Sequence, residues 1–263
     1  MTEETQSYTF PWGFHLGDLS QGRERIPLYT PSNDGGFCLL YDKASEKQAD
    51  DLIESLCLEL LSSMPYEHLK VKMFDFGKKK FYHLSPLQYI HLYHNSHNTE
   101  MIEQTFQTIE ELVVSRHTDL LCCNRKTIDE HNQKSKLKQG YQLLLINLEN
   151  FPSQDFSLRR IQNFVESAQK AGVYVIAFGN QSIQESQNPN VQAILKYFKT
   201  IKVTNNVFDI NVELFEFMEL LETHTFAPLS LNKPELLQST LTKADLEQLM
   251  NPENIKLESD TKV

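Results

Sequence analysis

The chain has 263 residues, of which 25 are Lys or Arg and 35 are Asp or Glu, so its formal net charge at pH 7 is −10. Hydrophobic residues make up 40% of the chain and charged residues 23%, which is ordinary globular usage and excludes a wholly disordered chain. The acidic pI of about 5.4 argues against a protein that coats nucleic acid by charge alone, because such domains are usually basic.

The sequence shows no pattern typical of export or membrane insertion. Residues 1–8 are polar and acidic, without the basic and apolar regions of a signal peptide. The longest apolar run, Leu143–Leu148, contains Asn147 and is far shorter than the ~18 residues that a membrane span needs. The four cysteines show no CxxC spacing, which predicts free thiols in a reducing compartment. We therefore expect a cytoplasmic protein.

Closely spaced Gly and Pro residues are prominent in the N-terminal part of the chain. This composition predicts an irregular arm over residues 1–34, with a short strand at Arg25–Tyr29. The aromatic residues Phe10, Trp12 and Phe14 are expected to cover an edge of the sheet, with docking to a partner as the alternative.

From residue 35 onward, strands and helices are predicted in alternation. In chain order, hydrophobic periodicity and capping residues predict a strand at Phe37–Tyr41, a helix from Glu46, capped by Ser45, to before Pro65, a strand at Leu69–Phe76, a polar His-rich connection at Pro86–Asn98, a helix at Thr99–Cys122, a helical or irregular piece at Thr127–Lys138, a strand at Tyr141–Ile146, a helix at Ser157–Ala171, a strand at Val173–Phe178, a short helix at Val191–Tyr197, a strand at Thr200–Val203 and a helix at Asn211–Leu221.

The C-terminal residues are mostly polar. After Pro228 they offer one modest helix, at Lys243–Met250. We therefore divide the chain into an irregular arm (1–34), an α/β domain (35–225) and a polar tail with a short helix (226–263).

The alternation of strand and helix is typical of right-handed βαβ units. It predicts a mainly parallel sheet with helices on both faces, which is a three-layer α/β architecture. In such folds a ligand normally lies at the carboxyl ends of the strands.

Several segments, in order, resemble the FtsK/SpoIIIE-type motor domains of the FtsK–HerA superfamily, which includes the type VII secretion ATPases. Phe74–Lys78 resembles a strand-end segment of that family, and Arg116–Asn132 resembles its helix end and the segment that follows. Leu143–Asn147 is similar to its Walker B strand, and Ala171–Ala177 to the next strand. The resemblance runs from about Arg25 to about Val207 and implies a RecA-like P-loop fold.

The nucleotide-binding loop of this family is altered in the sequence. A P-loop has the pattern G-x-x-x-x-G-K-[ST], in which backbone N–H groups and the Lys bind phosphate and the Ser/Thr holds Mg²⁺. The matching stretch, Asp42–Asp50, contains no glycine and carries several acids that would repel a polyphosphate. Lys43, Ser45 and Lys47 remain at this loop, with the two lysines out of register.

The hydrolytic residues of the family are altered as well. Hydrolysis needs an Asp at a strand end to hold Mg²⁺ and a neighbouring group to orient water. The matching positions are Asn147 and Leu148. Glu149 is one residue further on, and on a continuing strand it would point to the opposite face. We therefore expect no ATP hydrolysis and no resident cofactor, with binding of ATP and Mg²⁺ without hydrolysis as the alternative that the sequence leaves open.

The resemblance and these departures together imply a pseudo-ATPase. In this interpretation an FtsK-like core has lost hydrolysis and serves as a structural or regulatory partner of a DNA-handling, defence or secretion motor complex. Because motors of this superfamily work as rings, the resemblance implies a protein partner, either an active FtsK-type ATPase or further copies of this chain. Contact with DNA would then occur through that complex.

Two alternatives remain open from the sequence. The first is an NTPase or DNA translocase subunit with a remodelled loop, in which Lys43 or Lys47 acts with Glu149. The second is a DNA-binding module that uses the run of Lys78, Lys79 and Lys80, because lysines can contact the phosphate backbone. A basic run on a solvated turn is the commoner structural explanation for such lysines.

Four histidines lie close together in the sequence but do not predict a metal site. His91, His94 and His97 follow at intervals of three, with His83 nearby. That spacing spreads imidazoles around a helix, and neither a Cys nor a close carboxylate completes a tetrahedral set. We expect solvated histidines and no metal.

Overall fold

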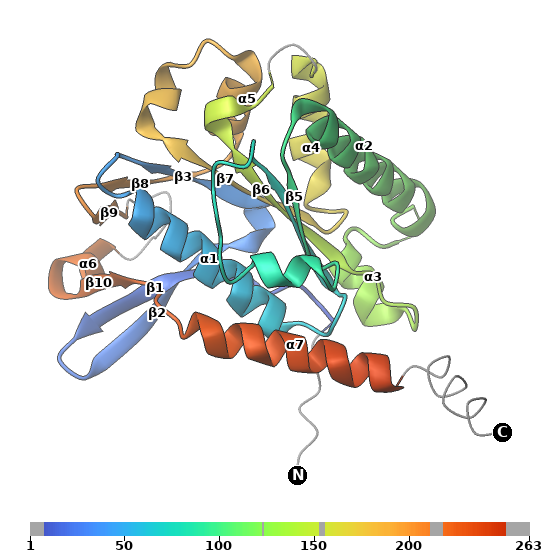
Figure 1. Ribbon diagram of the computed structural model, residues 1–263, viewed down its shortest axis with the longest axis horizontal. Coiled ribbons are helices and arrows are strands. Elements are labelled where there is room, and N and C mark those ends of the chain that lie inside the picture. The colour runs from blue at the N-terminus through green and yellow to red at the C-terminus, as the bar shows by residue number, and fades with distance from the viewer. Residues whose placement is uncertain (1–7, 123, 153–155, 211–217, 251–263) are drawn as a thin grey trace.

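Seven strands form the central sheet, in the spatial order β5-β4-β6-β7-β3-β8-β9 (Figure 1). The computed structural model describes residues 8–122, 124–152, 156–210 and 218–250. The strands are β3 (Gly36–Tyr41), β4 (Leu69–Phe74), β5 (Tyr93–Ser96), β6 (Tyr141–Asn147), β7 (Val173–Asn180), β8 (Thr200–Thr204) and β9 (Val207–Asp209). Neighbouring strands are parallel, except that β8 and β9 are antiparallel. The predicted α/β fold with a mainly parallel sheet is therefore confirmed.

Helices cover both faces of this sheet. The helices are α1 (Glu46–Ser63), α2 (Thr99–Ser115), α3 (Ile128–Lys134), α4 (Leu158–Ala168), α5 (Pro189–Tyr197), α6 (Met218–Thr223) and α7 (Lys233–Met250). Alternate residues of β6 enter two separate cores: Leu143 and Leu145 pack in the core of α1, whereas Leu144 and Ile146 pack in the core of α2, α4 and α5. Continuous apolar runs form such strands because both faces are buried.

A buried arginine joins α2 to the sheet. After α2 the chain continues as one π-helical turn, Arg116–Leu120. The guanidinium of Arg116 donates to the carbonyl oxygens of Ala171 and Gly140, each at 2.6 Å. Burial lowers the pKa of Arg116 to about 10. This side chain fixes the end of the α2 segment to the chain just before β6 and β7.

The N-terminal residues differ from the prediction of an irregular arm. β1 (Gly13–Gln21) and β2 (Glu24–Pro31) form an antiparallel hairpin, and β10 (Thr225–Pro228) pairs with β1 to complete a second, three-stranded sheet. Gly17 has a φ of +150°, and a Cβ there would lie 2.1 Å from the carbonyl oxygen of Ala227. The glycine therefore marks a β-bulge and a close approach of two strands, and not a loop.

Residues 226–250 also differ from the predicted polar tail with one short helix. α7 begins ten residues before the predicted helix start, and it lies along α1 (Figure 1). Thr240 and Ala244 are buried in α7. Lys233 forms 2.8 Å ion pairs with Asp51 and Glu54 of α1.

Three further strands were missed by the sequence analysis. β5 lies within the predicted polar connection, and β9 and β10 are strands of only three and four residues. Residues 211–217 of the predicted helix Asn211–Leu221 lie outside the described residues. The domain boundaries after residues 34 and 225 stay a prediction. Within the described parts of the chain, no helix combines the length and apolarity needed to cross a membrane.

Candidate functional site

The turn that joins β3 to α1 is short and is closed by its own carboxylate. It comprises only residues 42–45. Asp42 Oδ1 accepts hydrogen bonds from the backbone N–H and the Oγ of Ser45, at 2.8 and 2.6 Å. The hydrogen bond from Ser45 is the main reason that the pKa of Asp42 lies below its ordinary value. A P-loop presents free N–H groups to phosphate at this place, whereas here a side-chain anion already lies against the turn.

The β8–β9 hairpin holds the same turn from the other side. Asn205 and Asn206 both have positive φ, +51° and +62°, as a type I′ hairpin turn requires. The Asn205 N–H donates to Asp42 Oδ2, and the Asn206 N–H donates to Ser45 Oγ, each at 2.8 Å. The connection after β3 is therefore fixed to the neighbouring strand pair.

Lys79, from the loop after β4, forms a charge cluster with the first turns of α1. Its side chain is only 7% exposed, and its Nζ lies 2.7 Å from Glu46 Oε1 and 2.9 Å from Asp50 Oδ1. The same Nζ lies 4.8 Å from the ring centroid of Tyr41. Burial by itself would lower the pKa of Lys79, but the hydrogen bonds to both carboxylates outweigh it and raise the pKa. Burial raises the pKa of Asp50 in spite of Lys79.

A chain of hydrogen bonds connects the carboxyl ends of four strands. Asp75 follows β4; its Oδ2 accepts from the Lys79 N–H at 2.6 Å and its Oδ1 accepts from Asn147 Nδ2 at 2.7 Å. Asn147 Oδ1 accepts from the Glu149 N–H at 3.1 Å. Glu149 Oε1 accepts from the Asn180 N–H at 2.9 Å and from the Tyr41 hydroxyl at 3.3 Å. An ionised Asp at position 147 could not donate to Asp75, so the amide is what allows this buried contact.

The predicted nucleotide-site residues differ in burial and in their hydrogen bonds. Ser45 and Asn147 are buried in the hydrogen-bond arrangements above, whereas Lys43 and Lys47 are exposed and form no ion pair or hydrogen bond within the described residues. Glu149 does not point away from the site, because the strand ends at Asn147 and a 3-10 turn follows. The expectation for Glu149 is therefore corrected.

The predicted basic run does not form one surface. Lys78 and Lys80 are exposed, and Lys78 Nζ donates to Asn150 Oδ1 at 3.0 Å. Lys79 is turned inward to Glu46 and Asp50, so it is not available to a nucleic acid in this conformation. Sequence analysis missed these partners because the acids were interpreted only as repelling phosphate.

The described residues contain no group of three or more His, Cys, Asp or Glu side chains that could hold a metal ion. His94 lies on β5, opposite Lys72 of β4 in the strand register. Burial is the main cause that lowers the pKa of His94, and the charge of Lys72 adds to it.

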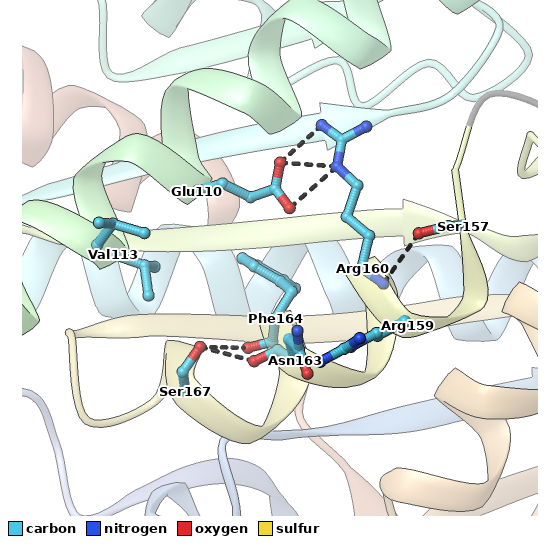
Figure 2. A pocket seen from close by; sticks show the side chains of 9 residues that line it. Glu110, Val113, Ser157, Arg159, Arg160, Asn163, Phe164 and Ser167 are labelled. Atoms are coloured by element: carbon cyan, nitrogen blue, oxygen red, sulfur yellow. Dashed lines mark hydrogen bonds and ion pairs between the residues drawn. The ribbon is translucent and has the colours of Figure 1, made fainter.

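A hollow of about 410 Å³ lies between α2 and α4 (Figure 2). Its two most prominent polar side chains, Arg160 and Ser167, already have partners. Arg160 binds Glu110 at 2.6 to 3.0 Å, and its guanidinium lies over Phe106 and Phe156. Ser167 Oγ donates to the carbonyl oxygen of Asn163 at 2.7 Å. This hollow therefore offers little unsatisfied chemistry to a ligand.

Comparison with known proteins identifies similar structures but no similar sequences. No protein-family model and no curated protein matches the chain. EssC (ATPases 2 and 3) from Geobacillus thermodenitrificans aligns with a TM-score of 0.65 and 14% identity, over 92% of this chain and 50% of that one. The cytoplasmic domain of EssC aligns with a TM-score of 0.62 and 13% identity, over 92% and 51%. The monomer form of the pCW3 conjugation coupling protein TcpA, with ATPγS, aligns with a TM-score of 0.51 and 15% identity, over 76% and 56%.

The chain shares its fold with the EssC and TcpA structures, which agrees with the resemblance to FtsK–HerA-type P-loop motors in the sequence. It spans about half the length of the EssC structures that it matches, and at these identities the likeness concerns the fold. In this FtsK-like fold, the turn of residues 42–45 and the ends of β4, β6 and β7 lie at the edge where a parallel α/β sheet normally binds its ligand.

Proposed function

We propose that this protein is an FtsK-like pseudo-ATPase that acts as a structural or regulatory partner of a DNA-handling, defence or secretion motor complex. The observation that carries the proposal is the Lys79 cluster. At the sheet edge where a P-loop motor holds a nucleotide, Lys79 of the chain itself lies between the carboxylates of Glu46 and Asp50. The edge therefore holds its own cation, and because one lysine cannot neutralise two carboxylates, it does not attract a phosphate.

Two further features support the absence of turnover. The Asp42 carboxylate accepts the hydrogen bonds of Ser45 and Asn205 at the start of α1, so an incoming phosphate would meet an anion. Asn147 donates to Asp75, and a neutral amide is a weaker Mg²⁺ ligand than the carboxylate that P-loop ATPases use.

The test is equilibrium binding of a fluorescent ATP analogue to the purified chain, with and without Mg²⁺, combined with a phosphate-release assay. We expect no saturable binding up to about 1 mM ligand, a range in which the binding free energy is only about −4 kcal/mol, and no phosphate release above background. Saturable binding that unlabelled ATP displaces would overturn the proposal.

A matched variant distinguishes a nucleotide site that has been lost from one that Lys79 only blocks. Lys79→Met removes the internal cation and leaves the turn of residues 42–45 unchanged. If the site is lost, the variant still binds no nucleotide, because the glycine-free turn cannot surround a phosphate. If Lys79 only blocks a competent site, the variant gains displaceable ATP binding, and the protein is then a gated ATPase.

The alternative is an NTPase with a remodelled loop. The observation that favours it is the position of Glu149 beside Tyr41 and Asn180, together with two exposed lysines, Lys43 and Lys47, at the start of α1. Lys47→Ala should then abolish turnover, whereas a pseudo-ATPase has no turnover to lose.

The proposed partner is an active FtsK-type ATPase or a further copy of this chain, with DNA contacted through the complex. EssC, EccC and TcpA, whose fold this chain shares, include secretion ATPases and a conjugation coupling protein. Sedimentation velocity of the chain alone, and mixed with an FtsK-type motor from the same cell, tests the partner. We expect a complex larger than the monomer in one of the two samples; a monomer in both would argue against the proposal.

A further inference from the structure

A second part of the sheet carries cations that the proposed function does not use. Along β4, Leu69, Val71 and Met73 pack in the core of α1. Because side chains of a strand alternate, Lys70 and Lys72 lie on the opposite face, beneath α2. Both are half-buried, in a place where a strand normally carries apolar residues.

These lysines form part of a groove between α2 and the sheet. The groove has a volume of about 520 Å³. Lys70 and Lys72 of β4 and Gln142 of β6 line it from the sheet, and Ile109, Leu112 and Glu111 line it from α2. It therefore combines a polar floor with an apolar wall, the composition that is typical of sites for small organic ligands.

The positive charge of the groove has no partner within the described residues. Neither Lys70 nor Lys72 lies within 4 Å of a carboxylate, and burial together with the charge of Lys70 lowers the pKa of Lys72. His94, opposite Lys72, is a further nitrogen base at this end of the sheet. The one acid of the lining, Glu111, accepts a hydrogen bond from Gln107 at 2.9 Å.

The hollow between α2 and α4 differs from this groove, because its cation has an anionic partner (Figure 2). There, Arg160 is bound by Glu110, the Ser167 hydroxyl donates to the main-chain carbonyl of Asn163, and the Ser157 hydroxyl accepts from the Arg160 N–H. In the groove beneath α2, two lysines lie beside each other on one strand, and neither forms an ion pair with Glu111, the one acid of the lining. Two half-buried cations without an ion-pair partner are unfavourable unless a ligand supplies one.

We propose that the groove beneath α2 binds a small organic anion. Its phosphate or carboxylate group lies between the ammonium groups of Lys70 and Lys72, and its apolar part lies against Ile109 and Leu112. Phosphate and carboxylate oxygens are the acceptors that an ammonium group binds most strongly. The proposal is independent of the strand-end site, because it uses none of the residues there.

The test is calorimetric titration of the purified full chain with phenyl phosphate, benzoate and inorganic phosphate. Phenyl phosphate or benzoate is expected to bind saturably below about 10 mM, and inorganic phosphate about tenfold more weakly because it lacks the apolar part. Which of the two aromatic anions binds more tightly tells whether phosphate or carboxylate is the native group. Absence of saturable binding for both aromatic anions would overturn the proposal.

Matched variants locate the site. Lys72→Met and Lys70→Met should each weaken binding by about tenfold or more, whereas Lys196→Met, at an exposed position of α5, should leave it unchanged. Lys72→Met should not lower the thermal midpoint, because it removes a half-buried charge that has no partner. Equal binding by the wild type and both groove variants would overturn the proposal.

Discussion

At the scale of single residues, Asn147 and Lys79 decide what the carboxyl edge of the sheet can do. Asn147 donates to Asp75 at 2.7 Å, which a carboxylate at the same position could not do without a proton or a metal ion. Lys79 places one cation between two carboxylates, Glu46 and Asp50. Through these two side chains, polar groups of this edge bind other groups of the protein.

Lys79→Met is expected to lower the free energy of unfolding at pH 7 by on the order of 1–3 kcal/mol. This is less than for a wholly buried pair, because Glu46 is half-exposed and solvent screens its charge. Urea unfolding of the variant beside the wild type measures the loss. Lys43→Met is the control and should change the free energy by less than about 0.5 kcal/mol.

The loss of unfolding free energy in Lys79→Met should depend on pH, and the sign of this dependence follows from the pKa of Asp50. Burial raises the pKa of Asp50, and removal of Lys79 raises it further. An acid whose folded-state pKa is raised favours folding more as the pH falls through that pKa. The difference in unfolding free energy between the wild type and Lys79→Met should therefore become smaller as the pH falls from 7 to about 4. A deficit that stays constant over this range would mean that lost packing, and not uncompensated charge, causes it.

At the scale of elements, the turn of residues 42–45 is defined by another part of the chain, the β8–β9 hairpin. Asp42 accepts from Ser45 within the turn and from Asn205 across to the hairpin. Neither element shows this connection in its own sequence. The short turn and the hairpin should therefore loosen together when Asp42 is replaced.

Asp42→Ala is expected to increase amide hydrogen exchange at both Ser45 and Asn205, because both N–H groups lose their acceptor. The contribution of Asp42 depends on pH. Its folded-state pKa is lowered, chiefly by the hydrogen bond from Ser45, so its stabilisation is present above its ordinary pKa of about 4 and is lost as the pH falls through the lower folded-state value. Exchange that rises at Ser45 alone would show that the hairpin does not depend on this carboxylate.

The elements that the sequence predicted well share one property. The strands β3, β6 and β7 are buried on both faces and read as continuous apolar runs. The strands that it missed are short or interrupted: β5 reads Tyr-His-Asn-Ser, and β1 contains Gly17 at its bulge. Their pairing comes from neighbouring strands, which a local pattern does not contain.

At the scale of the whole molecule, the hairpin β1–β2 and helix α7 complete the layer on the α1 side. Phe10 and Phe14 are buried in the same core as α1, as expected of aromatic residues that cover a sheet, whereas Trp12 is 68% exposed. Lys243 of α7 donates to the carbonyl oxygens of Ser62 and Met64 at the end of α1. These contacts make α7 part of the folded unit.

Ala244→Leu tests whether α7 unfolds in the same transition as the rest of the protein. Ala244 is 1% exposed, so a larger side chain should overpack the contact with α1 and destabilise the protein by about 1–3 kcal/mol. We expect a lower midpoint of a single urea transition followed by circular dichroism. Leu246→Ala, at a 55% exposed position of the same helix, is the control. An unchanged main transition in Ala244→Leu would show that α7 is an independent tail.

The sequence by itself determined the α/β class, the order of the central strands and helices, and the absence of P-loop glycines, because apolar periodicity and glycine positions are local properties of the chain. Tertiary structure alone decided where Lys79 lies, which side Glu149 faces, and how the β1–β2 hairpin, β10 and α7 pack. Each of these depends on residues 29 to 205 positions apart or on where a strand ends. Hydrogen bonds and ion pairs between distant residues form only after the apolar layers have brought the strand ends together.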